Sequence, residues 1–331
     1  MKKLFLSLAL VLMASTASAR DHIMIVGSST VYPFATIVGE KFGQQSGFKT
    51  PIVESTGTGG GMKLFCAGIG TQHPDITNAS RAIKNSEKEL CAKNGVAFQE
   101  FVVGNDGLAF ASSNEADPMD VTIAHIAAAL AAELDGKPNQ LKTWDQVDAY
   151  VESRGGQKLG LPNRPIAVMI PPPTSGTRDA MGSLFMKKGW KALGLEGSGY
   201  KHIREDGVAI EMGENDNLIV EKLVTDAEMF GVFGYSFFDT NRDKVQASRI
   251  NGVTITFDSI ASYEYPGARP LYFYVKKDHM GVIPGMQDFM MEFISDRAMG
   301  MDGYLFAAGL VPLSASDYGD QVLALAKLAP R

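Results

Sequence analysis

Cysteine, long apolar runs and clustered positive charge are all scarce in this chain. Its 331 residues include only two cysteines and five histidines. After residue 19, no stretch reaches the roughly 18 uncharged apolar residues that a membrane-spanning helix needs. The formal net charge is −6, and no dense run of lysine and arginine interleaves with aromatic residues. Because nucleic-acid binders usually carry the opposite charge, we expect neither nucleic acid nor anionic membrane as a partner.

Motifs of metal, nucleotide and nucleophile chemistry are also missing. No histidine belongs to a His-Glu-x-x-His metal pattern, and we expect all five histidines to be ordinary surface residues. The loop at 57–61 is followed by Met62 where a dinucleotide fingerprint needs glycine, and Lys63 precedes Leu64 where a P-loop needs serine or threonine. Segment 234–238 lacks the final glycine of a nucleophile elbow. We therefore expect no catalytic residue, metal or cofactor, and a hydrolase assembled from distant Ser and His residues is the remaining enzyme alternative.

The first residues have the features of a secretory signal peptide. Two lysines follow the initial methionine, an apolar run covers 4–13, and small residues end in Ala17-Ser18-Ala19. An apolar run this short does not span a bilayer, so we predict a cleavable leader over 1–19 and a periplasmic protein. Loss of the two lysines makes the chain more negative. An anionic ligand would therefore have to be held by local donors.

The two cysteines are expected to form one disulfide. Export places Cys66 and Cys91 in an oxidising compartment, which favours pairing. A buried free thiol is the alternative for each, and two cysteines without nearby histidines are a poor metal site.

Strands and helices alternate along the chain with short loops between them. Strands are expected at 23–26, 50–54 and 166–170, with a strand end at 75–77 and β-rich sequence over 253–275. Helices are expected from Tyr32, from Met62, over 86–92 with Ser86 as N-cap, over 179–190 and within 284–307. Two apolar stretches, 100–103 and 107–111, surround a plausible crossing between lobes at 104–106. This alternation predicts an α/β fold with mainly parallel sheets.

Three loops combine serine or threonine with glycine where a strand is followed by a helix. They are Ser28-Ser29-Thr30, the run 56–61 and Thr174-Ser175-Gly176-Thr177. The first turn of a helix leaves N–H groups unpartnered and carries partial positive charge, so it attracts anions. Capping is the simpler explanation for any one loop. Three such loops in one exported chain favour a shared pocket for a tetrahedral oxyanion.

At these residues the chain resembles the periplasmic phosphate-binding proteins of ABC importers, which have the type II periplasmic binding protein fold. The matching text is Gly-Ser-Ser-Thr-Val-Tyr-Pro at 27–33, Gly-Thr-Gly-Gly-Gly at 57–61, Asn-Ala-Ser-Arg at 78–81 and Ser-Gly-Thr-Arg at 175–178. Gly213-Glu214-Asn215-Asp216 resembles a further segment of that family. The resemblance implies two lobes around a ligand cleft, with lobe I at 20–104 plus 268–331 and lobe II at 105–267. It also implies a protein that delivers inorganic phosphate to the permease of an ABC importer in the inner membrane, with no covalent chemistry. A monomer is the default expectation, and the oligomeric state stays open at this point.

The resemblance also implies where the anion is bound. The donors carried over are Thr30, Val31, Thr58, Ser80, Arg81, Ser175, Gly176 and Thr177. Ser29 in the first loop and Arg178 after the last complete the predicted phosphate site.

Two positions depart from the family pattern. Many members have an acidic residue where Arg81 stands, and an arginine where this chain has Pro171. Positive charge would come instead from Arg81 and Arg178, whose planar paired donors suit oxyanions. A surface ion pair is the alternative for either arginine. The choice between phosphate and sulfate, molybdate or tungstate therefore stays open at this point.

Overall fold

The computed structural model describes residues 20–173, 175–213 and 217–328. The predicted leader at 1–19, Thr174 and the Glu214-Asn215-Asp216 part of the resembling segment lie outside the described residues. In the described part of the chain, no helix has both the length and the apolar character needed to cross a membrane.

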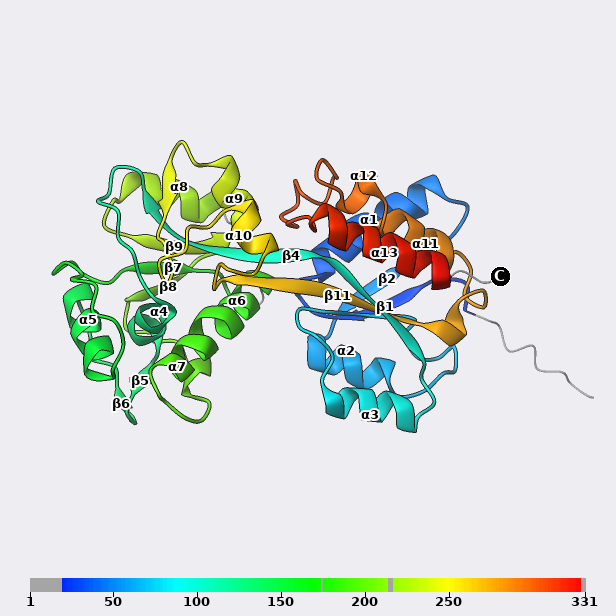
Figure 1. Ribbon diagram of the computed structural model, residues 1–331, viewed down its shortest axis with the longest axis horizontal. Helices are drawn as coiled ribbons and strands as arrows, with labels where there is room; N and C mark the ends of the chain where they lie inside the picture. Colours follow the sequence, from blue (N-terminus) through cyan, green and yellow to red (C-terminus); the bar gives the residue numbers. More distant parts are fainter. Residues whose placement is uncertain (1–19, 174, 214–216, 329–331) are drawn as a thin grey trace, which may run out of the picture.

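The molecule consists of two lobes side by side, joined by two long strands (Figure 1). The main sheet has nine strands in the order β2-β1-β3-β11-β4-β9-β7-β8, with β10 also paired to β4. Strand β1 is parallel to β2 and β3, and β7 is parallel to β8 and β9. The crossing strands β4 and β11 are antiparallel to their neighbours. The two-lobed α/β fold predicted from the sequence is confirmed.

Helices cover both faces of the sheet in each lobe (Figure 1). The lobe that contains both described ends of the chain has β1 Met24–Gly27, α1 Tyr32–Gln45, β2 Ile52–Ser55, α2 Thr58–Phe65, β3 Ile76–Ala79, α3 Asn85–Lys93, the 3-10 turn η3 Lys277–His279, α11 Met286–Phe293, α12 Asp296–Met299 and α13 Ala315–Leu328. The other lobe has α4 Ile123–Leu130, β5 Glu133–Leu134, β6 Lys137–Pro138, α5 Trp144–Ser153, β7 Val168–Ile170, α6 Gly176–Met181, the π-helical η1 Gly182–Lys187, α7 Lys188–Ala192, the 3-10 turn η2 Gly199–Lys201, β8 Ala209–Glu211, α8 Asn217–Thr225, β9 Phe230–Gly234, α9 Tyr235–Thr240, β10 Val245–Ala247 and α10 Phe257–Ala261.

The crossing is made by β4 (Phe98–Ser113) and β11 (Ala268–Lys276), which pair along much of their length. The two apolar stretches predicted around residues 104–106 are thus one continuous strand. Only β11 forms within the β-rich stretch expected over 253–275, which also contains helix α10. The lobe limits at 104/105 and 267/268 stay a prediction, and both fall on or beside the crossing strands.

Helix α2 begins four residues earlier than the sequence indicated, because its glycines belong to the helix and not to a loop. The helix starts at Thr58, where Met62 was expected. A Cβ added at Gly61 would lie 2.5 Å from the Cα of Gly27 and 2.6 Å from the Thr77 hydroxyl oxygen. Glycine at this position therefore lets the helix pack directly on strand β1.

Three other boundaries differ from expectation. Helix α3 has Lys84 as N-cap, so Ser86 lies inside its first turn. The segment 75–77 leads into strand β3 and does not end it. Helix α6 starts at Gly176, three residues before the predicted start, because Ser175 serves as N-cap by accepting a hydrogen bond from the Thr177 N–H.

Each lobe has its own hydrophobic core. In lobe II, Phe110, Trp144 and Phe230 are fully buried and their rings contact one another. In lobe I, buried Phe273 of β11 contacts Phe293 of α11. Because β4 and β11 contribute to both regions, the cores hold the crossing strands in place on either side of the cleft.

The predicted disulfide between Cys66 and Cys91 is confirmed, and it connects the end of α2 to α3. Replacing both cysteines with alanine is expected to lower the free energy of unfolding by about 3 kcal/mol, since the bridge closes a loop with a sequence separation of 25. For a chain of this size the melting temperature should fall by roughly 5 to 10 °C.

Thermal denaturation with and without reductant tests this prediction. Reductant should lower the melting temperature of the parent chain but leave the double variant unchanged. Equal melting temperatures for the parent and the variant in non-reducing buffer would contradict it, as would the addition of two alkyl groups to the unreduced parent in an intact-mass measurement.

Candidate functional site

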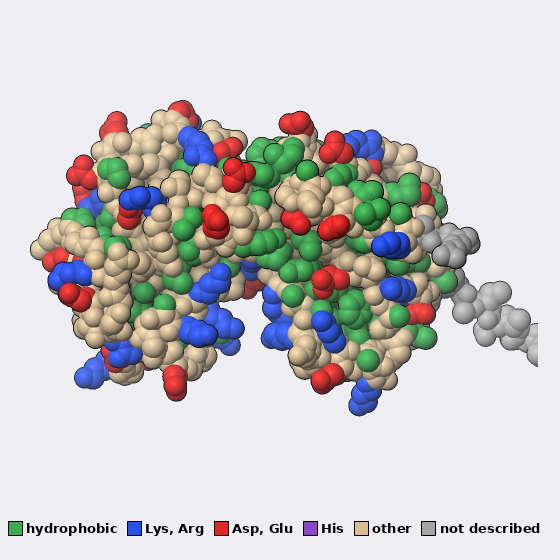
Figure 2. Space-filling view, viewed as in Figure 1, with side chains coloured by type: hydrophobic (Ala, Val, Ile, Leu, Met, Phe, Trp, Pro, Cys, Tyr) green, Lys and Arg blue, Asp and Glu red, His purple; other side chains and the backbone are tan. Residues whose placement is uncertain are grey.

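A large cleft of about 1550 Å³ lies between the two lobes. Its walls come from lobe I residues such as Ser29, Thr58 and Ser80, and from lobe II residues such as Ser175 and Arg178. Lysine and arginine side chains lie on both sides of the notch between the lobes (Figure 2). A chain of net negative charge therefore presents a locally positive surface to whatever enters the cleft.

The first loop connects β1 to α1 and is tightly organised. The Ser28 side chain is fully buried, and its hydroxyl oxygen accepts a hydrogen bond from the Thr30 N–H at 3.2 Å. Ser29 lines the cleft. Val31 is fully buried in the lobe I core, so only its backbone N–H is relevant to a ligand. The loop thus points Ser29 and the start of α1 towards the cleft.

The second loop leads into α2 and lies against the end of β3. Gly57 has φ of 71°, which glycine adopts without strain, and it directs the chain into the helix. The Thr58 hydroxyl oxygen accepts a hydrogen bond from the Ser80 N–H at 3.2 Å and lies 3.3 Å from the Ser80 hydroxyl. The first N–H groups of α2 have no partner within the helix, so this end of the cleft offers backbone and hydroxyl donors together.

The third loop is the lobe II contribution, and it touches the first loop directly. Gly176 packs so closely that an added Cβ would lie 2.6 Å from the Cα of Thr30 and 2.9 Å from the Ser29 carbonyl oxygen. The Thr30 hydroxyl donates to the Gly176 carbonyl at 3.1 Å. The two lobes therefore meet at this point, and the cleft opens away from it.

The two arginines predicted from the sequence both line the cleft, and both are paired with carboxylates. Arg81 makes two hydrogen bonds to Glu87, at 2.7 and 2.9 Å, and this pairing raises the pKa of Arg81. Arg178 lies 3.0 Å from Glu211. It also donates to the Pro171 carbonyl at 2.6 Å, which places its charge beside the position where the related family has an arginine.

A third arginine, which sequence reasoning missed, occupies the centre of the site. Arg269 of β11 is only 7% exposed and lines the cleft. Its guanidinium donates to the Thr30 hydroxyl at 2.8 Å, to the Ser183 hydroxyl at 3.1 Å and to the Asp106 carboxylate at 3.0 Å. It thus contacts both lobes and both crossing strands. Its signal in the sequence was a lone cation within a β-rich stretch.

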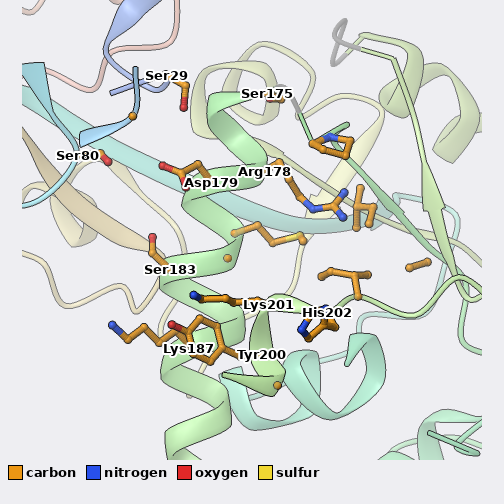
Figure 3. A pocket seen from close by; sticks show the side chains of 18 of the residues that line it. Ser29, Ser80, Ser175, Arg178, Asp179, Ser183, Lys187, Tyr200, Lys201 and His202 are labelled. Carbon is orange, nitrogen blue, oxygen red and sulfur yellow. The ribbon is translucent and has the colours of Figure 1, made fainter. Parts of the chain in front are cut away.

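One carboxylate also enters the cleft near the three loops. Asp179 lies four residues after Ser175 on the same face of the helix, and it points towards the wall that carries Ser29 and Ser80 (Figure 3). Among the residues that the structure describes, no cation lies within 4 Å of its carboxylate. An anion held by the loops would therefore have a carboxylate beside it.

Six of the ten predicted site residues line the cleft directly. They are Ser29, Thr58, Ser80, Arg81, Ser175 and Arg178. The other four are Thr30, Val31, Gly176 and Thr177, which lie next to lining residues in the same loops. Ligand contact by each of them stays a prediction.

The expectation of five surface histidines is wrong for two of them. His125 is fully buried, with its ring 3.1 Å from Asp148 and 2.7 Å from the Thr122 hydroxyl, and burial lowers its pKa. His279 is also buried, 2.5 Å from Asp75. Neither histidine lines the cleft. His125 contacts Thr122, which is the N-cap residue of α4. Both histidines therefore satisfy polar groups inside a lobe.

A comparison with family models finds one, described as a PBP superfamily domain, that matches residues 13–297. Among named relatives, Protein SphX of Synechococcus elongatus is 32% identical over 300 residues, which covers 88% of this chain and 77% of the relative. Phosphate-binding protein PstS of Staphylococcus saprophyticus is 28% identical over 300 residues, which covers 89% of this chain and 81% of the relative.

A solved structure gives the same result at the level of the fold. The crystal structure of a possible phosphate binding protein from Planctomyces limnophilus superposes with a TM-score of 0.73 at 26% sequence identity. The match covers 95% of this chain and all of the other. The likeness therefore extends over both lobes and the cleft between them.

Proposed function

This chain belongs to the PBP superfamily, and on that premise we propose that it is a solute-binding protein that captures inorganic phosphate and delivers it to an ABC importer. The observation that carries the proposal is the convergence of three donor-rich loops and Arg269 on one cleft between two lobes. Relatives named as phosphate-binding proteins support phosphate as the ligand. The protein acts outside the cytoplasm as a monomer that docks on permease subunits, and it performs no covalent chemistry.

The anion is bound mainly by neutral donors, with one buried cation. Backbone N–H groups at the starts of α1, α2 and α6, with the hydroxyls of Ser29, Thr58 and Ser80, surround its oxygens. Arg269 supplies a charge-assisted hydrogen bond, which is roughly twice as strong as a neutral one. Closure of the lobes about β4 and β11 removes the anion from water and strengthens each of these contacts.

Preference for phosphate over sulfate comes from Asp179. A carboxylate beside a bound anion repels it unless a proton lies between the two. Phosphate at neutral pH still carries a proton that it can donate to Asp179, whereas sulfate carries none. Asp179 thus provides the acceptor that Arg81 cannot provide at its own position.

Titration of ligand-free protein with orthophosphate is expected to give saturable one-to-one binding with a micromolar Kd or tighter, roughly −8 kcal/mol or more favourable. Sulfate, molybdate and tungstate should displace bound phosphate only weakly. Isothermal calorimetry followed by anion competition measures both quantities.

Three outcomes would contradict the proposal. Tighter binding of another tetrahedral oxyanion would assign the protein to that ion. The absence of heat and of any shift in melting temperature with all four anions would remove oxyanion capture altogether. Repeated turnover of a chromogenic phosphate ester would instead show a hydrolase.

A further inference from the structure

We propose that the cleft contains a second anionic subsite beyond the three loops, and that the protein also binds short linear oligophosphates there. This inference rests on the proposed function, because the terminal phosphoryl group would occupy the same loops as orthophosphate. The second subsite is formed chiefly by Lys187 and Lys201, with Tyr200 between them and Lys84 on the facing lobe.

One helix face connects the two subsites. Elements α6, η1 and α7 form a continuous helix from Gly176 to Ala192. Its cleft-lining residues include Ser175, Asp179, Ser183 and Lys187, each four positions after the last. At the α-helical rise of 1.5 Å per residue, the stretch from Ser175 to Met181 alone covers roughly 9 Å, and the π-helical residues carry the same face on to Lys187. A single phosphate ion at the loops touches only the first turn of this face.

The middle of the helix departs from α geometry where the second subsite begins. Residues Gly182–Lys187 are π-helical, a rare geometry that often marks functional sites. Long helical side chains lean back towards the helix N-terminus, so the Lys187 ammonium lies nearer to the loops than its Cα does. Figure 3 shows Lys187, Tyr200 and Lys201 grouped together in the cleft, apart from Ser29 and Ser175.

Lys187 and Lys201 lack the carboxylate partners that the other cations of the cleft have, whereas Lys84 interacts electrostatically with Glu87. Arg81, Arg178 and Arg204 each pair with a carboxylate, those of Glu87, Glu211 and Asp206 respectively. Within residues 20–173, 175–213 and 217–328, no carboxylate lies within 4 Å of the ammonium groups of Lys84, Lys187 or Lys201. Glu133 and Glu205 also line the cleft but form no ion pair with these lysines.

Lobe closure turns this arrangement into a site for negative charge. Lys84 stands on lobe I, and Lys187 and Lys201 stand on lobe II, so closure brings like charges towards one another. Their repulsion grows as water leaves the cleft and the effective dielectric constant falls. A row of phosphoryl groups neutralises them, since lysine binds phosphate as a point charge and the Tyr200 hydroxyl adds a donor.

The length of the cleft decides which phosphate compounds fit. Orthophosphate fills only the loop subsite, whereas a linear chain of three phosphoryl groups extends along the helix face towards Lys187. Each added phosphoryl group also contributes negative charge at the end of the cleft where Lys187 and Lys201 have no carboxylate partner among the described residues. Tripolyphosphate is therefore the probe with which to test the second subsite.

The experiment compares orthophosphate with tripolyphosphate in metal-free buffer at physiological ionic strength. The double variant Lys187→Ala/Lys201→Ala should weaken tripolyphosphate binding by about tenfold or more and orthophosphate binding by less than about threefold, because screening at this ionic strength confines the effect to nearby charges. The matched control is Lys137→Ala/Lys222→Ala, which removes two exposed lobe II lysines outside the cleft lining. It should leave both affinities unchanged.

Competition between orthophosphate and tripolyphosphate distinguishes the second subsite from phosphate capture at the three loops. Saturating orthophosphate should displace tripolyphosphate, because both occupy the three loops. Tripolyphosphate that stays bound under these conditions, or that binds the cleft and control variants equally well, would overturn the second subsite while leaving phosphate capture intact. Failure of the parent protein to bind orthophosphate would contradict the proposed function itself.

Discussion

Replacement of Arg269 by methionine is expected to weaken phosphate binding by at least about 100-fold, roughly 2.7 kcal/mol. The substitution keeps an unbranched apolar stem but removes the guanidinium that donates to Thr30 and Ser183. Hydrogen bonds to a charged group contribute about 1.5 to 3 kcal/mol each. The change also leaves the Asp106 carboxylate without its partner, which places an uncompensated negative charge near the anion.

Two further variants separate these effects. Adding Asp106→Asn to Arg269→Met removes the unpaired carboxylate, so part of the affinity should return if repulsion contributes to the loss. Arg249→Met is the matched control, because Arg249 pairs with Asp120 on the exposed surface. Calorimetry and melting temperature should be measured together. Unchanged affinity in a well-folded Arg269→Met protein would show that this arginine has no part in anion capture.

Asp179→Asn is expected to reduce the preference for phosphate over sulfate by at least about 100-fold. The amide has no negative charge to repel sulfate, and its NH2 group donates a hydrogen bond where the carboxylate accepted one. Sites that hydrogen-bond a specific group of the ligand discriminate between ligands by factors of about 10⁴ to 10⁵. A change of about 100-fold from the loss of a single acceptor lies well within that range. Phosphate affinity itself should fall, since the amide oxygen is a weaker acceptor than a carboxylate.

The control for this variant is Glu205→Gln, which removes a negative charge from the same cleft but away from the three loops. It should change the affinities for phosphate and sulfate by similar small factors. Competition titrations of both variants give the selectivity directly. A phosphate preference that survives Asp179→Asn would locate the proton acceptor elsewhere in the cleft.

The three loops could be predicted from the sequence because the groups that suit them to bind an anion are neighbours in the chain. At a strand-to-helix junction, glycine allows the backbone geometry that an anion site needs, and the neighbouring serine or threonine supplies a hydrogen-bonding group. Ser29, Thr58 and Ser175 were found in this way, Ser80 came from the family resemblance, and all four line one cleft. The alternation of strands and helices likewise predicted the two-lobed α/β fold.

Arg269 could not be predicted because its role depends on contacts between distant parts of the chain. It lies 239 positions from Thr30 in the sequence, and the residues around it form no pattern that indicates an anion site. Its importance comes from the crossing of β11 between the lobes, which a sequence pattern does not define. The same reason explains the buried histidines, since Asp148 and Asp75 meet them only in the folded lobes.

The glycine run before Met62 was misread for a different physical reason. Consecutive glycines usually indicate a loop because they have low helix propensity. Here the tight packing of Gly61 on Gly27 requires a residue without a side chain inside the helix. Tertiary packing thus overrides propensity at the position where the helix end faces the cleft.

The pairing of β4 with β11 makes the molecule modular. Gly107 and Ala268 are direct partners in the two crossing strands, so the chain leaves lobe I and returns to it at neighbouring positions. Lobe II is therefore an insertion whose two ends are adjacent, an arrangement that tolerates domain exchange and circular permutation. We therefore expect the second lobe to be exchangeable at these two positions while the strands and helices of the first lobe stay in place.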